Sequence, residues 1–424
     1  MRGCFTKNSK VHGASHASSR DRRGLIGCAT AYELVRNGHT VELIESATDV
    51  GTGCSFANGA QLSYSFVEPL ANPGTLKALP YLLLKADSPL RFKIQIDCLQ
   101  WSWLYDFVRA CTAKQASVGT YELLMLAGLS RATLETWMQD EKDWPIGFER
   151  SGKLVLCPDM KSLDQQARQV KFQEQWGSNQ RLLTREECIG QEPALARSES
   201  NFVGGVWTAS ECVADPYLLC QALAASAVSR GVKLHLNTSV EGWVSKLGRV
   251  IGVTTTNNQI QADAFVVCAG TASVGIAHKL GLKLPIYPVK GYSLTLPVKE
   301  AMHSPQCSIT DLGLKTVFAP LNGQLRVAAA AEIVGHGLEL NQRRVAQMCS
   351  SVEKMFPGAF EIGASQPWAG LRPATPNSLP LIGPSPIPGV WLNTGHGALG
   401  LTLAAGSARR LVDTLASSRK VGRD

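Results

Sequence analysis

The chain has 424 residues, of which 45% are hydrophobic and 18% charged, so it is long enough to form two domains with complete cores. Its net charge is +8, but six basic residues and one acidic residue within the first 23 account for most of this excess. The charge that remains is too small to imply a nucleic-acid partner, and no run of about 18 apolar residues predicts a membrane-spanning helix.

Twelve cysteines are spread along the chain without a C-x-x-C pair and without the spacing of a zinc site. A chain with this pattern and no secretory signal is typical of a reducing compartment, where thiols stay free. We therefore expect a cytoplasmic location and no bound metal.

The N-terminal region carries part of a dinucleotide-binding fingerprint. Gly24-Leu25-Ile26-Gly27 opens a helical pattern, which is followed by Asn37-Gly38 and by the apolar run Val41–Ile44 ending at Glu45. In a G-x-G-x-x-G loop, the second glycine lets the backbone approach a pyrophosphate, and the third lets the helix pack closely on the strands. The helix N-terminus attracts the phosphates. Glu45 lies where a carboxylate binds ribose hydroxyls, which favours FAD or NAD over NADP.

The first half of this fingerprint is absent from its expected place. Arg22 stands where the first glycine belongs, and residues 1–23 lack any run of apolar or β-branched residues that predicts a strand. Their basic, serine-containing composition is similar to that of a transit peptide, but a mis-assigned start, a frameshift or a truncated gene copy is the favoured interpretation. We therefore expect residues 1–23 to be aberrant or unstructured and the sheet to lack its central strand.

Between residues 46 and 230, the sequence predicts a loop, a helical region and two strands. The apolar stretch Thr75–Lys85 has basic flanks and predicts either a buried helix or a segment that rests on a bilayer surface. In chain order, the predicted elements are a glycine-rich loop at Gly51–Ser63, a mostly helical region at 70–145, strands at Gly152–Cys157 and Val203–Trp207, and a helix at Pro216–Arg230.

From residue 232 onward, strands dominate until the last helix. Asn322-Gly323 is a strong hairpin turn signal between two of these strands. The predicted elements are strands at Val232–Leu236, Val244–Thr256 (a hairpin), Ala264–Gly270, Ile286–Pro297, Thr316–Pro320, Leu325–Ala331 and Val390–Asn393, then a glycine-rich loop at Thr394–Gly400 and a helix to Leu415. Nucleotide-binding pieces thus stand at the start, middle and end of the chain. This order suits FAD, which is long enough to need anchoring at two ends.

These elements predict an α/β fold with two parts. One is a Rossmann-like FAD-binding domain, incomplete at its N-terminus, formed by residues 24–64, 212–275 and 372–424. The other is an inserted α+β substrate domain containing an antiparallel sheet, formed by residues 65–211 and 276–371.

Six stretches in the same order resemble the FAD-dependent D-amino acid oxidase superfamily and, within it, the small subunits of D-amino acid dehydrogenases. The resemblance spans residues 24–415 and rests on Gly24–Glu45, Ser55–Gln61, Cys268–Gly270, Pro288–Tyr292, Gly370–Pro376 and Thr394–Gly397. It implies FAD as the cofactor. The cofactor contacts that we expect are Gly24, Gly27, Glu45, Ser55, Asn58, Gln61, Val240, Gly270, Gly395, Gly397 and Thr402.

The resemblance also implies roles in the substrate site for three residues. The guanidinium of Arg372 would bind the substrate carboxylate through two parallel hydrogen bonds; a structural ion pair is the alternative. Tyr292 would bond the same carboxylate or simply pack within its strand. His396 belongs to a loop that contacts the flavin, and we expect it there rather than as a general base.

Two further expectations concern loops. Gly395 and Gly397 precede a helix whose positive N-terminal end would favour the reduced flavin. The polar side chains of Ser55, Asn58 and Gln61 would donate to the cofactor, or else the loop bonds to itself.

The predicted function is flavin-dependent oxidative deamination of D-amino acids to 2-oxo acids and ammonia, with electrons passed to a quinone or respiratory carrier. Similar enzymes need no protein base, so catalysis would rest on positioning and on the cofactor. One alternative is glycine/sarcosine oxidase-like amine oxidation using oxygen. Another is a non-catalytic product of a truncated gene that is unable to hold FAD. Peripheral contact with the inner membrane is the alternative to a freely cytoplasmic location.

Overall fold

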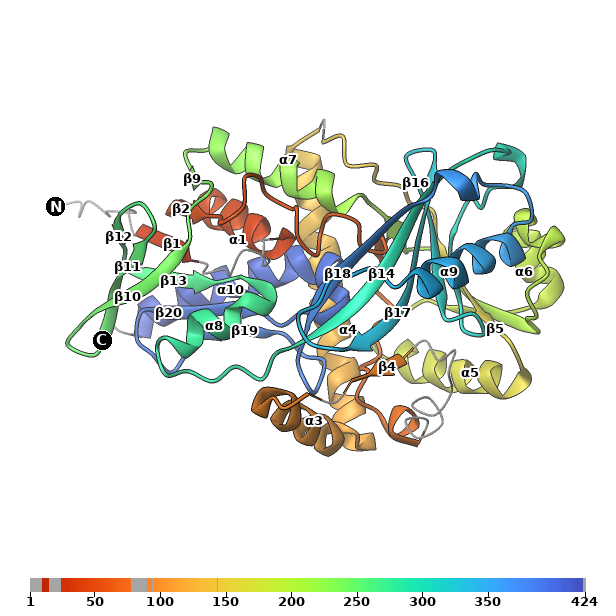
Figure 1. Cartoon of the computed structure of the whole chain (residues 1–424), viewed down its shortest axis with the longest axis horizontal. Helices are drawn as coiled ribbons and strands as arrows, with labels where there is room; N and C mark the ends of the chain where they lie inside the picture. Colours follow the sequence, from red (N-terminus) through yellow and green to blue (C-terminus); the bar gives the residue numbers. More distant parts are fainter. Residues whose placement is uncertain (1–9, 15–23, 78–89, 94, 143, 422–424) are drawn as a thin grey trace.

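The computed structural model describes residues 10–14, 24–77, 90–93, 95–142 and 144–421. Two large sheets dominate this part of the chain: a six-stranded, mostly parallel sheet in one half and a nine-stranded mixed sheet in the other (Figure 1). Among the described residues, none of the helices is both long and apolar enough to cross a membrane. Most of the Thr75–Lys85 stretch, from residue 78 onward, lies outside the described residues.

The six-stranded sheet has a central strand, β1 (Lys10–Ala14), that the sequence did not predict. It pairs in parallel with β13 (Ala264–Val267) on one side and with β2 (Thr40–Ile44) on the other. The expectation that residues 1–23 hold no strand is therefore wrong for residues 10–14. The backbone groups of two flanking parallel strands need partners, and a short strand satisfies them without an apolar run of its own. The sheet is completed by β9 (Lys233–His235), β20 (Val390–Thr394) and the antiparallel β19 (Leu381–Pro384).

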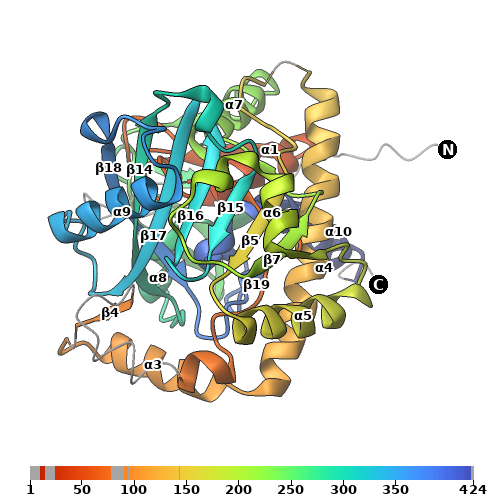
Figure 2. The same cartoon turned by 90° about the vertical axis from the view of Figure 1, so that its right-hand side faces the viewer.

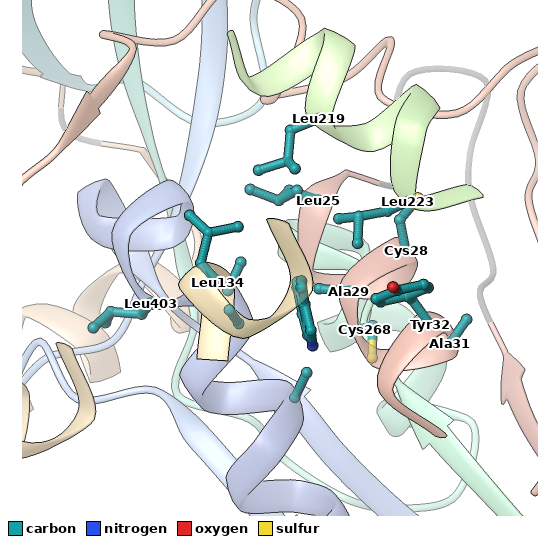
Figure 3. Packing of buried hydrophobic residues seen from close by; sticks show 14 of the residues in the cluster. Leu25, Cys28, Ala29, Ala31, Tyr32, Leu134, Leu219, Leu223, Cys268 and Leu403 are labelled. Carbon is teal, nitrogen blue, oxygen red and sulfur yellow. The ribbon is translucent and has the colours of Figure 1, made fainter. Parts of the chain in front are cut away.

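Helices α1 (Leu25–Arg36) and α10 (Gly400–Val421) lie against one face of this sheet. Helix α7 (Pro216–Ser229) packs on α1 and helix α4 (Ala113–Asp140) packs on α10, and the four helices share one apolar core (Figure 3). Although residues 65–211 were expected in the substrate domain, α4 contributes Leu123, Leu126 and Leu134 to this core. The other face is covered by α8 (Ser273–His278) and a small sheet of β10 (Val240–Lys246), β11 (Arg249–Thr255) and β12 (Gln259–Gln261).

The nine-stranded sheet forms the second half of the molecule. Its order is β18 (Gln366–Ala374), β14 (Tyr287–Pro297), β17 (Gln324–Ile333), β16 (Thr316–Leu321), β15 (Ser308–Asp311), β5 (Lys153–Cys157), β7 (Gly204–Thr208) and β6 (Arg181–Thr184), with β4 (Leu90–Phe92) beside the end of β17. Strand β18 includes Arg372, so this arginine belongs to the nine-stranded sheet, although the sequence placed residue 372 at the start of the FAD-binding part. The turn at Asn322-Gly323 joins β16 to β17 as predicted.

One face of this sheet is apolar and carries α9 (Gln342–Met355) and α6 (Arg185–Gln191); we call it the outer face (Figure 2). The opposite, inner face is approached by the chain from Ser55 to Ser65, in which β3 (Gln61–Leu62) pairs with β8 (Cys212–Val213). Helices α3 (Cys98–Ala110) and α5 (Met160–Glu174) also belong to the described part of the chain, as do helical residues at 73–77. Short 3-10 segments occur at Pro193–Arg197, Gly270–Ala272, Ala301–His303, Ile362–Ala364 and Gly397–Leu399.

Candidate functional site

The carboxyl edge of the six-stranded sheet gathers the predicted nucleotide contacts. Glu45 follows β2 and is fully buried, and its Oε1 accepts the backbone N–H of Ala47 at 2.8 Å. Gly270 follows β13, and Val240 opens β10 close to Glu45, because the N–H of Thr238 donates to the Glu45 carbonyl at 2.9 Å. A crevice outside the carboxyl ends of parallel strands is where such sheets bind nucleotides.

The start of α1 lies against the loop that carries Ser55. The backbone N–H of Leu25 donates to Ser55 Oγ at 3.0 Å, and a Cβ placed on Gly24 would lie 2.6 Å from the same oxygen. A glycine at position 24 is therefore what allows this close approach. Gly27 is buried in the first turn of α1, as expected of the glycine at which the helix packs on the sheet.

Residues Ser55–Ser65, which we call the crossing loop, run over the inner face of the nine-stranded sheet. Ser293 of β14 donates to the Ala57 carbonyl at 2.5 Å, and Arg326 of β17 donates to the Asn58 carbonyl at 3.0 Å. Further along, the side chain of Gln61 bonds Ser308 of β15. The loop therefore lies between the nine-stranded sheet and the nucleotide-binding half.

The polar side chains of the crossing loop bond to the protein. Asn58 Oδ1 accepts the N–H of Ala60 at 2.9 Å, and Gln61 Oε1 accepts from Lys153 at 3.0 Å. Together with the Ser55–Leu25 bond, these contacts match the alternative of a loop that bonds to itself and to its surroundings. The bonds of Ser55 and Asn58 use acceptor oxygens, and we propose that the loop contacts the cofactor through its remaining donors.

The loop before α10 combines two left-handed glycines with a buried histidine. Gly395 and Gly397 have φ values of +82° and +54°, which favour glycine over residues with a side chain. His396 between them is buried, and neither ring nitrogen has a partner in the described part of the chain. Burial lowers the pKa of His396 to about 3, so its ring is neutral at physiological pH. A ring with such a low pKa is a poor general base. This environment is consistent with the role that we expected for His396, that of a residue in a flavin-contacting loop.

Thr402 connects this region to the crossing loop. It lies in the first turn of α10, and its Oγ1 accepts the backbone N–H of Ser63 at 3.0 Å. The structure thus brings Gln61, Ser63, Thr402 and the start of α10 together.

Arg372 points along the inner face toward Gly291. A Cβ on Gly291 would lie 2.6 Å from Arg372 Cζ, so glycine is needed for the guanidinium to lie there. Nη1 donates to the Ala330 carbonyl at 3.2 Å, and no carboxylate of the described residues forms an ion pair with this guanidinium. Burial lowers the pKa of Arg372, yet the group stays charged, with donors available for an anionic ligand.

A β-bulge in β17 supplies the carbonyl that contacts Arg372. The pairing of β14 with β17 shifts register between Lys290 and Tyr292, and Ala330 in the bulge has a φ of +61°. The extra residue turns the Ala330 carbonyl toward the guanidinium.

Tyr292 lies on the other face of the same sheet. Side chains alternate along β14, so Gly291 and Ser293 face the crossing loop while Tyr292 packs with the outer-face core under α9. Its hydroxyl donates to Glu332 Oε2 at 2.9 Å, and burial with this hydrogen bond raises its pKa. The structure therefore does not bring Tyr292 together with Arg372.

Several inner-face residues were not singled out from the sequence. Lys153, Arg326 and Thr310 lie on this face, and Glu211 lies buried beside it; the Thr310 hydroxyl is buried with no partner among the described residues. For Lys153, the available signal was a lysine at the start of an otherwise apolar strand, Lys153–Cys157.

The donor set fits FAD. The N-terminus of α1 suits a pyrophosphate, and the start of α10 offers a positive helix end to a reduced flavin. The unpartnered nitrogens of His396 and the hydroxyl of Thr310 are buried polar atoms of the kind that a ligand completes.

Comparison with known proteins is consistent with this geometry. The family model for DAO, described as FAD dependent oxidoreductase, matches residues 23–414. D-amino acid dehydrogenase 2 of Ralstonia nicotianae is 42% identical over 402 residues, covering 93% of this chain and 95% of that protein. The protein of the same name from Pseudomonas aeruginosa is 41% identical, covering 92% of this chain and 93% of that protein.

Solved structures show the same fold at lower identity. Glycine oxidase from Geobacillus kaustophilus superposes with a TM-score of 0.74 at 21% identity, covering 97% of this chain and 95% of that one. L-proline dehydrogenase from P. horikoshii has a TM-score of 0.74 at 18% identity, covering 97% and 94%.

Proposed function

The chain belongs to the DAO family of FAD-dependent oxidoreductases, and from that premise we propose that it oxidatively deaminates D-amino acids and passes the electrons to a quinone or another respiratory carrier. The family makes it an enzyme that uses FAD. The observation that most supports an amino-acid substrate is the buried guanidinium of Arg372, which has a single protein hydrogen bond among the described residues.

In this proposal, Arg372 binds the substrate carboxylate and thereby fixes the position of the Cα atom and the amine. The starts of α1 and α10 would hold FAD, which would supply the acceptor for the two electrons that leave the substrate. Oxidation of the amine gives an imino acid, and water converts it to a 2-oxo acid and ammonia. Because burial lowers the pKa of His396 to about 3, its ring is a poor proton acceptor, and in this proposal the amine loses its proton to solvent.

Sequence identity favours a dehydrogenase over the oxygen-using alternative. The relatives named D-amino acid dehydrogenase 2 are 41–42% identical, whereas glycine oxidase is 21% identical and shares the fold alone. Glycine or sarcosine oxidation with oxygen is the second candidate. The third candidate, a product that cannot hold FAD, was based on the absence of a central strand. Strand β1 occupies that place, so this argument no longer applies.

The test uses the purified full-length protein with FAD and without oxygen. We expect D-alanine to bleach the yellow flavin absorbance and L-alanine to leave it unchanged, with a quinone analogue then restoring the colour. Pyruvate and ammonia should form in equal amounts. Failure of D-alanine to bleach a flavin-loaded protein would contradict the proposed substrate. Hydrogen peroxide formed in step with turnover would favour the second candidate.

A further inference from the structure

Lys153 is a buried cation on the inner face of the nine-stranded sheet. Its side chain is among the least exposed charged groups, at 3% of its full accessible area. Burial lowers the pKa of Lys153 to about 8, although the charge of Glu211 opposes this shift. Burying a cation costs free energy unless it is paired, so the hydrogen-bond partners of Lys153 indicate its role.

Both partners of Lys153 belong to the crossing loop. Nζ donates to Ser63 Oγ at 2.8 Å and to Gln61 Oε1 at 3.0 Å, and it lies 4.5 Å from the ring centre of Phe66. The bonds reach two successive inward-facing residues of the loop, so they fix its direction as well as its position.

Glu211 is a second buried charge that bonds to the loop. Its Oε1 accepts the backbone N–H of Ser65 at 2.7 Å, and the hydroxyl of Ser63 bonds it as well as Lys153. Glu211 Oε2 has no partner among the described residues. The two opposite charges therefore hold residues 61–65 between them.

The same residues of the loop hold the start of α10. Ser63 donates its backbone N–H to Thr402 Oγ1 at 3.0 Å, and the Thr402 hydroxyl lies 3.4 Å from the Gln61 carbonyl. The first turn of α10 thus depends on the position of residues 61–63, and through them on Lys153.

We propose that Lys153 is a positioning residue for FAD: it holds Gln61 and Ser63 so that the crossing loop and the start of α10 are arranged to receive the flavin. The inference goes beyond the proposed function, because it does not depend on which amine the enzyme oxidises. An apolar residue at this position would remove a costly buried charge, and it would leave the loop without its two charged hydrogen bonds.

The test compares Lys153→Met with Lys290→Met. Lys290 is a matched control: it is also a buried lysine of this sheet with a pKa lowered mainly by burial, but it lies on the outer face and donates to the Glu339 carbonyl. Titration of each FAD-free protein with FAD, followed by flavin fluorescence, gives the dissociation constant. We expect Lys153→Met to raise it about tenfold or more and Lys290→Met to change it less than about twofold.

Two further measurements separate positioning from loss of folding. The thermal midpoint of FAD-free Lys153→Met should stay near that of the wild type, and Lys153→Met/Glu211→Gln, which also removes the second charge, should bind FAD weakly while remaining folded. Ser63→Ala should weaken FAD binding, and its effect should add only in part to that of Lys153→Met, because both variants remove the bond between Lys153 and Ser63.

Wild-type FAD affinity in Lys153→Met, an equal loss in Lys290→Met, or fully additive effects with Ser63→Ala would overturn the proposal. A wild-type protein that binds FAD but is not bleached by D-alanine would instead contradict only the proposed substrate.

Discussion

Arg372 illustrates how a single charge is prepared for a ligand. The space beside Gly291 and the carbonyl of Ala330 hold the guanidinium away from water, and its other donors remain available. Paired with a carboxylate in such a place, an arginine contributes charge-assisted bonds that are about twice as strong as neutral ones.

We expect Arg372→Met to raise the KM for D-alanine about 100-fold, because a lost charged pair costs about 1.5–3 kcal/mol. The FAD content of the variant should match the wild type. Steady-state kinetics with a quinone analogue measures the change. Arg344→Met is the control, since Arg344 is a buried arginine that pairs with Glu332 on the outer face. A KM that is unchanged in Arg372→Met, or raised equally in Arg344→Met, would argue against the carboxylate site.

His396 predicts how stability depends on pH. Its pKa of about 3 in the folded protein lies below the ordinary value of 6.5, so the unfolded chain takes up this proton first as pH falls. The stabilisation is therefore complete above about pH 6.5 and is lost progressively toward pH 3. Between pH 7 and 5.5, FAD-free wild type should lose about 1 kcal/mol more unfolding free energy than His396→Gln. Urea unfolding at the two pH values measures this, and parallel losses in both proteins would contradict it.

At the scale of residues, sequence motifs suggest candidate positions, such as the loop around His396 and the arginine at 372. They do not give the face of a sheet on which a side chain lies, because this depends on the register of the strand. Tyr292 and Gly291 are neighbours in sequence, yet they face opposite sides of the sheet. Lys153 was not singled out from the sequence because its hydrogen-bond partners, Gln61 and Ser63, lie about 90 positions away along the chain.

Among the elements, strand β17 contains a residue with a strained backbone conformation, and a substitution can relieve this strain. Ala330 has a φ of +61°, a conformation that costs a residue with a Cβ about 1 kcal/mol or more. Ala330→Gly should raise the unfolding free energy by about 0.5–1 kcal/mol, after allowing for the greater freedom of glycine in the unfolded chain. Ala329→Gly, one residue earlier and without a positive φ, should instead lower it by a similar amount. Equal signs for the two variants would contradict this interpretation of the bulge.

The end of strand β1 and the start of helix α1, with its N-cap Gly24, together provide all three glycines of the fingerprint. Gly13-Ala14 ends β1 and Gly24-Leu25-Ile26-Gly27 opens α1, so only residues 15–23 separate the two halves of a G-x-G-x-x-G sequence.

Deleting residues 15–23 joins Ala14 directly to Gly24. We expect this variant to bind FAD about tenfold more tightly, because the strand end and the helix N-terminus then have the spacing that a pyrophosphate requires. Fluorescence titration with FAD measures the change. Replacing the same nine residues with glycine and serine keeps the separation, and this control should bind like the wild type. Unchanged affinity after the deletion would show that the separation does not matter.

The elements also show what local pattern can and cannot predict. The β16–β17 hairpin and helix α7 follow from their own residues: a turn at Asn322-Gly323 and, for α7, the cap of Asp215 before Pro216. Strand β1 does not follow from its own residues, because it forms by pairing with two strands that are distant in sequence, at residues 40–44 and 264–267.

Across the whole molecule, the order of elements predicts a nucleotide-binding part assembled from distant pieces, and the six-stranded sheet does combine strands from the start, middle and end of the chain. The boundary between the halves was harder to place. Helix α4 joins the core under α1 and α10, and β18 carries residue 372 into the nine-stranded sheet. Both depend on which apolar face meets which partner in three dimensions, and the composition of a segment does not specify this.

The position of β13 and β20 in the same sheet as β1 has a consequence for folding during synthesis. While the ribosome is still making the last third of the chain, β13 has no β20 beside it, and the apolar faces of α1 and α4 await α10. The nascent chain therefore exposes an open sheet edge and an uncovered core until β20 and α10 emerge, a state prone to aggregation. Assembly of this half thus follows the synthesis of α10, well after its first strands have been made.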